Sequence, residues 1–223
     1  MVDTVLRVRR RRAASKTAEA ALRYAALGWP VCLGECSPAA GKRGQDPHRA
    51  CSCDRIGCPA PGAHPVSPAW QNVATSDPDL VANWWLATPT ASVILVTGRV
   101  FDVLDAPGAI GLTALTRMER SGLRPGPVAI SADERVHFYV RSRGAPADEN
   151  EWWSCHLDCE PEEIADMTGL RWHCRNSYVV APPSITGTGA PCRWLREPRT
   201  HELLDGLRLL EFLSDACEEA RSQ

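Results

Sequence analysis

The residues with the clearest chemistry form one short pattern, Cys51-x-Cys53-x4-Cys58-x5-His64. Three thiols and one imidazole match the ligand number and the softness of a tetrahedral zinc site. The glycines and prolines between them allow the tight turns that such a knuckle needs. Because the protein would supply all four ligands, the site would be closed, which is typical of a structural zinc ion and not of a catalytic one.

Other cysteines and histidines leave the ligand set open. The residues near enough in the sequence to replace one ligand of the knuckle are Cys32, Cys36 and His48. A weaker second set consists of Cys155, His156, Cys159, His173 and Cys174. This second set is typical either of another zinc site or of a group of buried structural cysteines.

The overall composition is that of an ordinary globular protein with one sizeable core. Of the 223 residues, 44% are hydrophobic and 23% are charged, and the formal net charge is −2. The total charge therefore does not indicate a nucleic-acid partner. The first sixteen residues are nevertheless rich in arginine, and they form either a solvated, disordered tail or a contact to phosphate groups.

The distribution of apolar residues also bears on the compartment. No apolar run approaches the roughly 20 residues of a membrane span, and the N-terminal region lacks the apolar segment of a secretory signal. We therefore expect a cytoplasmic protein. In a reducing compartment, clustered cysteines indicate a metal site more often than disulfides, which agrees with the predicted knuckle.

Hydrophobic periodicity and turn residues predict a mixture of helices and hairpins. Helices are expected over residues 17–28, from residue 78 onward, and over 109–121, 160–168 and 200–220. Strands are expected over residues 29–33, 92–97, 100–105, 127–131, 135–141, 172–181 and 192–195. This order predicts an α+β fold with a mostly antiparallel sheet and flanking helices, into which the knuckle is inserted.

The same pattern suggests a division of the chain. We expect a basic tail over residues 1–16, a main domain over 17–199 with the knuckle at 46–66, and a C-terminal helix over 200–223 that packs on the domain. The predicted apolar face of the helix at residue 78 consists of Leu80, Val81, Trp84, Trp85 and Leu86. For the last helix, the predicted inward residues are Leu203, Leu204, Leu207, Leu210 and Phe212.

An ordered set of segments carries a family resemblance over about residues 17–196. The segments are Ala20–Val31, Gly62–Pro65, Trp84-Trp85, Val96–Gly98, Phe101–Asp105, Val136–Tyr139, Asn176–Ser184 and Arg193–Leu195. In this order they resemble the bifunctional DNA primase–polymerase (prim-pol) domain of the archaeo-eukaryotic primase superfamily, in its bacterial, actinobacterial-like form. The resemblance implies an RRM-like core, nucleotidyl transfer with Mg or Mn, and DNA and nucleoside triphosphates as partners.

The resemblance also assigns residues to the chemistry. Two-metal nucleotidyl transfer needs carboxylates from adjacent strands to hold the ions, and a histidine can donate a hydrogen bond to the triphosphate. The matching catalytic positions are Asp102, Asp105 and His137. The matching or neighbouring positions for phosphate are Lys42, Arg43, Arg171 and Arg175.

Two departures from the family pattern limit this assignment. Asp102 and Asp105 are three residues apart, so a regular strand would point them to opposite faces unless a bulge intervenes. The family's third carboxylate falls on Arg171. An arginine there would turn a cation site into an anion site, together with Arg175.

Three functions are therefore open. The first is an active primase or polymerase, and the second is a non-catalytic, zinc-stabilised module that binds DNA, nucleotide or a protein. The third is a structural protein that keeps only the fold. The number of carboxylates in the site discriminates between them, because each missing ligand weakens binding of the ions.

Overall fold

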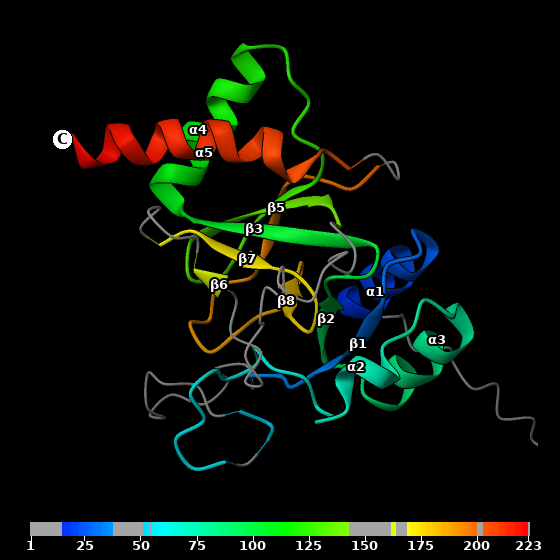
Figure 1. The fold of residues 1–223 in the computed structure, drawn as a ribbon. Helices are drawn as coiled ribbons and strands as arrows, with labels where there is room; N and C mark the ends of the chain where they lie inside the picture. The colour runs from blue at the N-terminus through cyan, green and yellow to red at the C-terminus, as the bar shows by residue number, and fades with distance from the viewer. Residues whose placement is uncertain are drawn as a thin grey trace, which may run out of the picture.

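Two antiparallel sheets form the centre of the protein (Figure 1), which confirms the predicted α+β fold class. The computed structural model describes residues 15–37, 51–53, 55–142, 162–163, 169–199 and 203–222. The three-stranded sheet has the order β1 (Val31–Gly34), β2 (Ser92–Val96) and β8 (Tyr178–Ala181). The six-stranded sheet has the order β6 (Glu162–Glu163), β7 (Arg171–His173), β3 (Phe101–Pro107), β5 (Arg135–Arg141), β4 (Val128–Ile130) and β9 (Arg193–Arg196).

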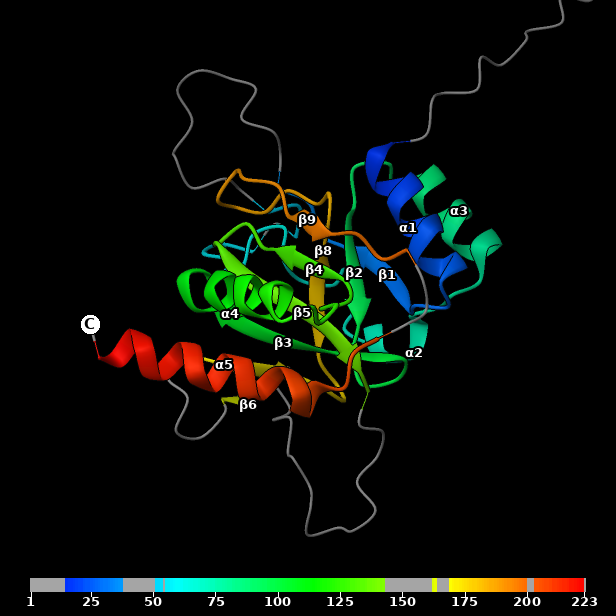
Figure 2. The ribbon, with the colours of Figure 1, turned by 90° about the horizontal axis from the view of Figure 1, so that it is seen from above.

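The helices cover the sheets unequally. They are α1 (Lys16–Ala26), α2 (Trp70–Val73), α3 (Pro78–Ala87), α4 (Gly108–Arg120) and α5 (Gly206–Arg221). Helices α4 and α5 lie together over one face of the six-stranded sheet, and the segment after residue 50 lies on the opposite side (Figures 1 and 2). Helices α1 and α3 pack together beside the small sheet. None of the described helices has the length and apolar character needed to cross a membrane.

Side-chain caps mark the start of α1, α3 and α5. Ser15 accepts a hydrogen bond from the backbone N–H of Ala18 at 3.2 Å, so α1 begins one residue before the expected residue 17. Helix α5 begins later than the expected residue 200, because Asp205 is its N-cap and accepts from the N–H of Leu207 at 2.9 Å. The buried residues of α5 include Leu209 and Leu213, whereas Leu207, which is predicted to face inward, is 54% exposed.

The predicted apolar face of α3 is also only partly correct. Val81 and Trp85 are buried, but Leu80 and Leu86 are exposed. The stripe that a single helix face can bury is narrow, and five apolar residues within seven positions exceed it.

Two hydrophobic clusters lie on opposite sides of the six-stranded sheet, and a smaller third one lies on the small sheet around Trp70. One cluster, on the side of α1 and the small sheet, contains Phe101 and Val103 and is centred on Trp29, which stacks on Tyr139 with ring centroids 5.3 Å apart. The other lies under α4 and α5 and contains Leu104. Successive residues of β3 therefore alternate between the two clusters, as strand geometry requires.

Two local predictions are wrong. The segment 172–181 is not one strand, because it turns after β7 and continues as β8 in the other sheet. Asn176 has a left-handed φ of 61° in this turn, and a Cβ at Gly98 would lie 2.2 Å from the Cα of Arg175, so only glycine allows the two chains to cross. The acidic segment 160–168 is predicted as a helix, but Glu162–Glu163 form β6 and pair with β7.

Candidate metal centre and ligand cleft

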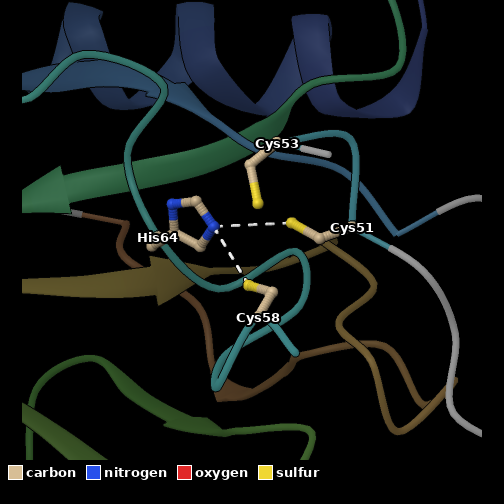
Figure 3. A group of neighbouring side chains, drawn as sticks. All are labelled: Cys51, Cys53, Cys58 and His64. Carbon is tan, nitrogen blue, oxygen red and sulfur yellow. Dashed lines mark hydrogen bonds between the residues drawn. The ribbon is translucent and has the colours of Figure 1, made fainter. Parts of the chain in front are cut away.

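The predicted knuckle residues Cys51, Cys53, Cys58 and His64 point toward one another (Figure 3). Their ligand atoms all lie within 4.8 Å of one another. The Nε2 atom of His64 is 3.4 Å from the Cys51 sulfur and 3.5 Å from the Cys58 sulfur. In a tetrahedron with ordinary Zn–S and Zn–N bonds, the sulfur–nitrogen separation is about 3.6 Å. These two separations match those of a zinc site, and the donor set of the four residues fits zinc.

Turns and strand contacts hold these ligands in place. Gly57 and Gly62 have φ values of 70° and 71°, which the turns on either side of Cys58 require. The segment that carries His64 continues the edge of the small sheet, because the N–H of Glu35 donates to the carbonyl of His64 at 2.8 Å. The knuckle is thus a local structure that is anchored to β1.

The protonation of the ligands also suits a metal. The Nδ1 atom of His64 lies 3.1 Å from the carbonyl oxygen of Pro65, which can only accept, so Nδ1 carries the proton and Nε2 is free to bind metal. A hydrogen bond from the backbone N–H of Arg55 lowers the pKa of the Cys53 thiol to about 7. Burial instead raises the pKa of Cys51 to about 11, and a bound zinc ion would offset this by holding the thiolate.

The alternative ligands that the structure describes lie outside the cluster. Cys32 is buried beside Trp70, and burial raises the pKa of its thiol to about 12. Cys36 lies 3.7 Å from the hydroxyl of Thr90. His48 is outside the described residues. Among the described alternatives, none joins the four residues of the knuckle.

The weaker second set of metal ligands is only partly described. Cys155, His156 and Cys159 lie outside the described residues. His173 and Cys174 are adjacent in the sequence and point to opposite sides of the sheet. His173 faces Asp105, whereas Cys174 packs against the cluster under α4 and α5. These two side chains therefore do not share one site.

A cleft of about 780 Å³ lies between the knuckle and the face of the six-stranded sheet that α4 and α5 leave uncovered. Its charged and imidazole side chains come from the large sheet and its turns and are Asp105, Asp133, Arg135, His137, Arg171 and His173. Its apolar side is formed by the knuckle and β8, with Pro59, Pro61, Ala63 and Val180. The cleft thus has one polar side and one apolar side.

Asp105 is the buried carboxylate at the centre of the polar side. The Nε atom of Arg135 lies 2.7 Å from one of its carboxylate oxygens and 2.9 Å from the other. The same guanidinium also donates to the carbonyl of Gly169 at 2.6 Å, which fixes its orientation. Burial acts to raise the pKa of Asp105, but the imidazoles of His173 and His137 and the charge of Arg135 outweigh it and lower the pKa to about 2.

Two histidines flank this ion pair. The Nε2 atoms of His137 and His173 lie 3.6 Å and 3.5 Å from the two oxygens of Asp105. The other ring nitrogen of His173 is 3.0 Å from the hydroxyl of Ser177. Burial lowers the pKa of His137 to about 4 against the opposing charge of Asp105. At neutral pH His137 is therefore an uncharged imidazole.

Asp102 lies on the other side of the sheet, as the spacing of three residues predicts. It is 1% exposed and accepts a hydrogen bond from the indole N–H of Trp172 at 3.3 Å, within the cluster under α4 and α5. The register of β3 with β5 is regular from Phe101 to Pro107, so no bulge redirects either aspartate. Asp102 and Asp105 cannot hold one pair of ions.

The predicted phosphate-binding residues separate in the same way. Arg171 lies directly opposite Asp105 in the register of β7 with β3, and it lines the cleft. It forms no ion pair with any side chain in the described part of the chain. Arg175 is exposed in the turn after β7 and does not line the cleft. Lys42 and Arg43 are outside the described residues.

Two residues that contact Asp105, namely Arg135 and His173, were not predicted as parts of the cleft. Arg135 is two residues before His137 on β5, and His173 is two residues after Arg171 on β7, so each pair lies on one face of its strand. This alternation was present in the sequence. What the sequence does not contain is the register that places both pairs beside Asp105.

The cleft does not fit the pair of divalent ions that two-metal chemistry uses. Among the described side chains, Asp105 is the single carboxylate at its centre, and Arg135 bonds both of its oxygens. Two imidazoles and a carboxylate are a donor set for a transition metal. Here both oxygens of Asp105 already accept the Nε–H of Arg135, and the positive charge of the guanidinium neutralises the one carboxylate of this set.

Comparison with known proteins agrees with the ordered motifs. The family model described as bifunctional DNA primase/polymerase, N-terminal, matches residues 21–207. Among curated proteins, none matches the chain. The matched region contains both sheets, the knuckle and every described residue of the cleft. The chain therefore belongs to the bifunctional DNA primase/polymerase N-terminal family.

Proposed function

We propose that this chain is a nucleotide-binding member of its family that does not carry out two-metal nucleotidyl transfer. The observation that carries the proposal is the ion pair in which both carboxylate oxygens of Asp105 accept the Nε–H of Arg135, combined with the position of Asp102 on the other side of the sheet. Two-metal chemistry depends on carboxylates that face the ions from the same side. A carboxylate neutralised by arginine attracts a cation poorly.

The polar side of the cleft suits an anion. Arg171 offers a guanidinium without an ion-pair partner among the described side chains, and planar guanidinium groups bind phosphate through paired hydrogen bonds. His137 is buried and His173 is half-buried, and both lie next to Asp105 on the same side of the cleft. The apolar side, formed by the knuckle and β8, offers a surface for the nucleoside. A ligand with a phosphate at one end and a flat ring at the other matches both sides.

The direct test is binding of dATP by the zinc-loaded protein in buffer without magnesium or manganese, measured by calorimetry. We expect binding, and we expect Arg171→Met to lower the affinity about tenfold, because a charge-assisted hydrogen bond contributes roughly 1.5–3 kcal/mol. Arg175→Met is the matched control, since Arg175 is exposed outside the cleft. Binding that requires manganese, or that ignores Arg171→Met, would contradict the proposal.

Family membership favours a second candidate, nucleotidyl transfer with magnesium or manganese, in which Asp105 and His137 would act. That reaction would require Arg135 to release Asp105. A primer-extension and de novo priming assay with both metals distinguishes the candidates. We expect no product. Extension that Asp105→Ala abolishes, while Asp133→Ala does not, would establish the enzyme.

The family description also makes DNA an expected ligand, and the basic segment over residues 1–16 is the part of the chain we assign to it. Contacts to phosphate groups of DNA weaken steeply with salt. Salt-dependent DNA binding by the full chain, reduced when residues 1–16 are deleted, would support this assignment.

A further inference from the structure

The knuckle forms one wall of the cleft. Pro59, Pro61 and Ala63 line the cleft directly. They lie between Cys58 and His64, which are two of the four ligands. Any change in the path of the chain between these ligands therefore changes the shape of the cleft.

The knuckle reaches the rest of the cleft through one close backbone contact. The N–H of Gly187, in the turn after β8, donates to the carbonyl of Pro61 at 2.7 Å. A Cβ at Gly187 would lie 3.0 to 3.3 Å from the ring atoms of Pro61, and a Cβ at Gly62 would lie 3.1 Å from the carbonyl of Ile185. The two segments thus touch through glycine at both points.

The turn that contains Gly187 also contacts the segment before Arg135, the partner of Asp105. Next to Gly187, the hydroxyl of Thr188 donates to the carbonyl of Ala132 at 3.2 Å. Ala132 belongs to the turn between β4 and β5, and Arg135 begins β5 at the end of this turn. A continuous set of contacts therefore links the metal ligands, through Gly187, to the arginine that holds Asp105.

The knuckle has little apolar packing of its own. Of its described residues, only Cys51 and Gly62 are buried, and Ile56 is fully exposed. Small loops of this kind depend on the metal for their folded conformation. The wall of the cleft is then only as stable as the zinc site.

We propose that zinc in the knuckle assembles the cleft, so that zinc binding and nucleotide binding strengthen each other. The identity of the ligand rests on the function proposed above, whereas the dependence of the wall on zinc does not. Linkage between two sites is reciprocal, so each ligand must raise the affinity of the other by the same factor.

The first experiment measures how zinc affects the protection of backbone amides at the wall of the cleft, without any nucleotide. Hydrogen exchange is followed in the zinc-loaded protein, after chelation, and after zinc is restored. We expect the amide of Gly187 to lose protection at least tenfold on chelation and to regain it with zinc, while amides of β3 and β5, such as those of Leu104 and Phe138, stay protected. Protection of Gly187 that is unchanged without zinc would overturn the proposal.

The second experiment tests reciprocity. The rate of zinc release to a chromogenic chelator is measured with and without dATP, and we expect dATP to slow it several-fold. Gly187→Val should weaken this effect, because its side chain pushes Pro61 away while all four metal ligands remain. Ala190→Ser, exposed in the same turn, is the control.

The outcomes separate the two proposals. If dATP does not bind the zinc-loaded protein at all, the proposed function fails, and the exchange of Gly187 still decides whether zinc holds the wall. If dATP binds but leaves zinc release unchanged, the linkage fails and the proposed function stands. If chelation unfolds the whole domain, the comparison of Gly187→Val with Ala190→Ser decides.

Discussion

The knuckle and the polar side of the cleft are both places where the sequence predicts metal ligands, and they differ in how those ligands are assembled. The knuckle takes all four from one segment, residues 51–64, and brings their ligand atoms within 4.8 Å. The cleft takes its groups from β3, β5 and β7. There, the carboxylate that faces inward is bonded by Arg135.

The two sites also differ in the source of the positive charge that balances their ligands. In the knuckle, three thiols and an imidazole point toward one another (Figure 3). In the cleft, the guanidinium of Arg135 already provides the positive charge that Asp105 needs. We therefore interpret the knuckle as a site for a metal ion and the centre of the cleft as a site where a protein cation replaces one.

The largest expected effect is loss of zinc from Cys58→Ser. Structural zinc sites contribute on the order of 10 kcal/mol or more to the folding of small metal-binding units, and a hydroxyl is a poor substitute for a thiolate. We expect the zinc content to fall from about one ion per chain to nearly none, as measured by elemental analysis of purified protein.

Cys36→Ser is the matched control for this experiment. Cys36 is half-buried near the knuckle and contacts Thr90, but it is not one of the four converging ligands. It should therefore keep its zinc. Loss of zinc from Cys36→Ser, or retention by Cys58→Ser, would show that the ligand set differs from the one described above.

A smaller effect is expected from breaking the ion pair of the cleft. Asp105→Ala leaves the guanidinium of Arg135 without its partner, and removal of one member of a buried pair costs about 3 kcal/mol. The free energy of urea unfolding of the zinc-loaded protein measures this cost. Asp133→Ala removes an exposed carboxylate from the same cleft and should change stability by less than about 0.5 kcal/mol.

The sign of the stability change in Asp105→Ala distinguishes a metal-binding carboxylate from one that forms an ion pair. A carboxylate that serves to bind a metal ion lowers the stability of the protein without the ion, so replacing it by alanine is neutral or stabilising. A carboxylate kept for an ion pair stabilises the fold. An increase in stability in Asp105→Ala would therefore contradict our interpretation of the centre of the cleft.

The knuckle was predictable from the sequence because its chemistry is local. The ligand types and their spacing appear within one short segment. The structure was needed to place Cys32 and Cys36 outside the cluster, and the third alternative, His48, lies outside the described residues. The general α+β fold and, to within one residue, the start of α1 were predictable for the same reason, since periodicity and capping act over a few residues.

The cleft was only partly predictable because its contacts depend on register. The spacing of Asp102 and Asp105 correctly predicts opposite faces. Nothing local indicates that Arg135 lies beside Asp105 or that His173 joins it instead of a second metal site. Strand pairing between segments far apart in the sequence decides both, and so does the turn at Asn176 that divides the segment 172–181 between two sheets.

The smallest expected effect is a pH dependence that belongs to the cleft alone. Burial lowers the pKa of His137 from 6.5 to about 4, so between these values the unfolded chain binds a proton at this residue that the native chain does not. The contribution of His137 to stability is therefore fully present above pH 6.5 and is lost as the pH falls toward 4. Asp105, with its pKa at about 2, stays ionised throughout this range.

At pH 5 the expected loss is roughly 2 kcal/mol relative to pH 7. Urea unfolding at both pH values should show a loss that is smaller by about this amount in His137→Gln than in the unaltered chain. Protonation of the knuckle ligands affects both proteins alike and cancels in the difference. An identical loss in the two proteins would mean that the pKa of His137 is the same in the native and unfolded chains. At pH 5 the cleft would then offer an anion one more positive group than we infer.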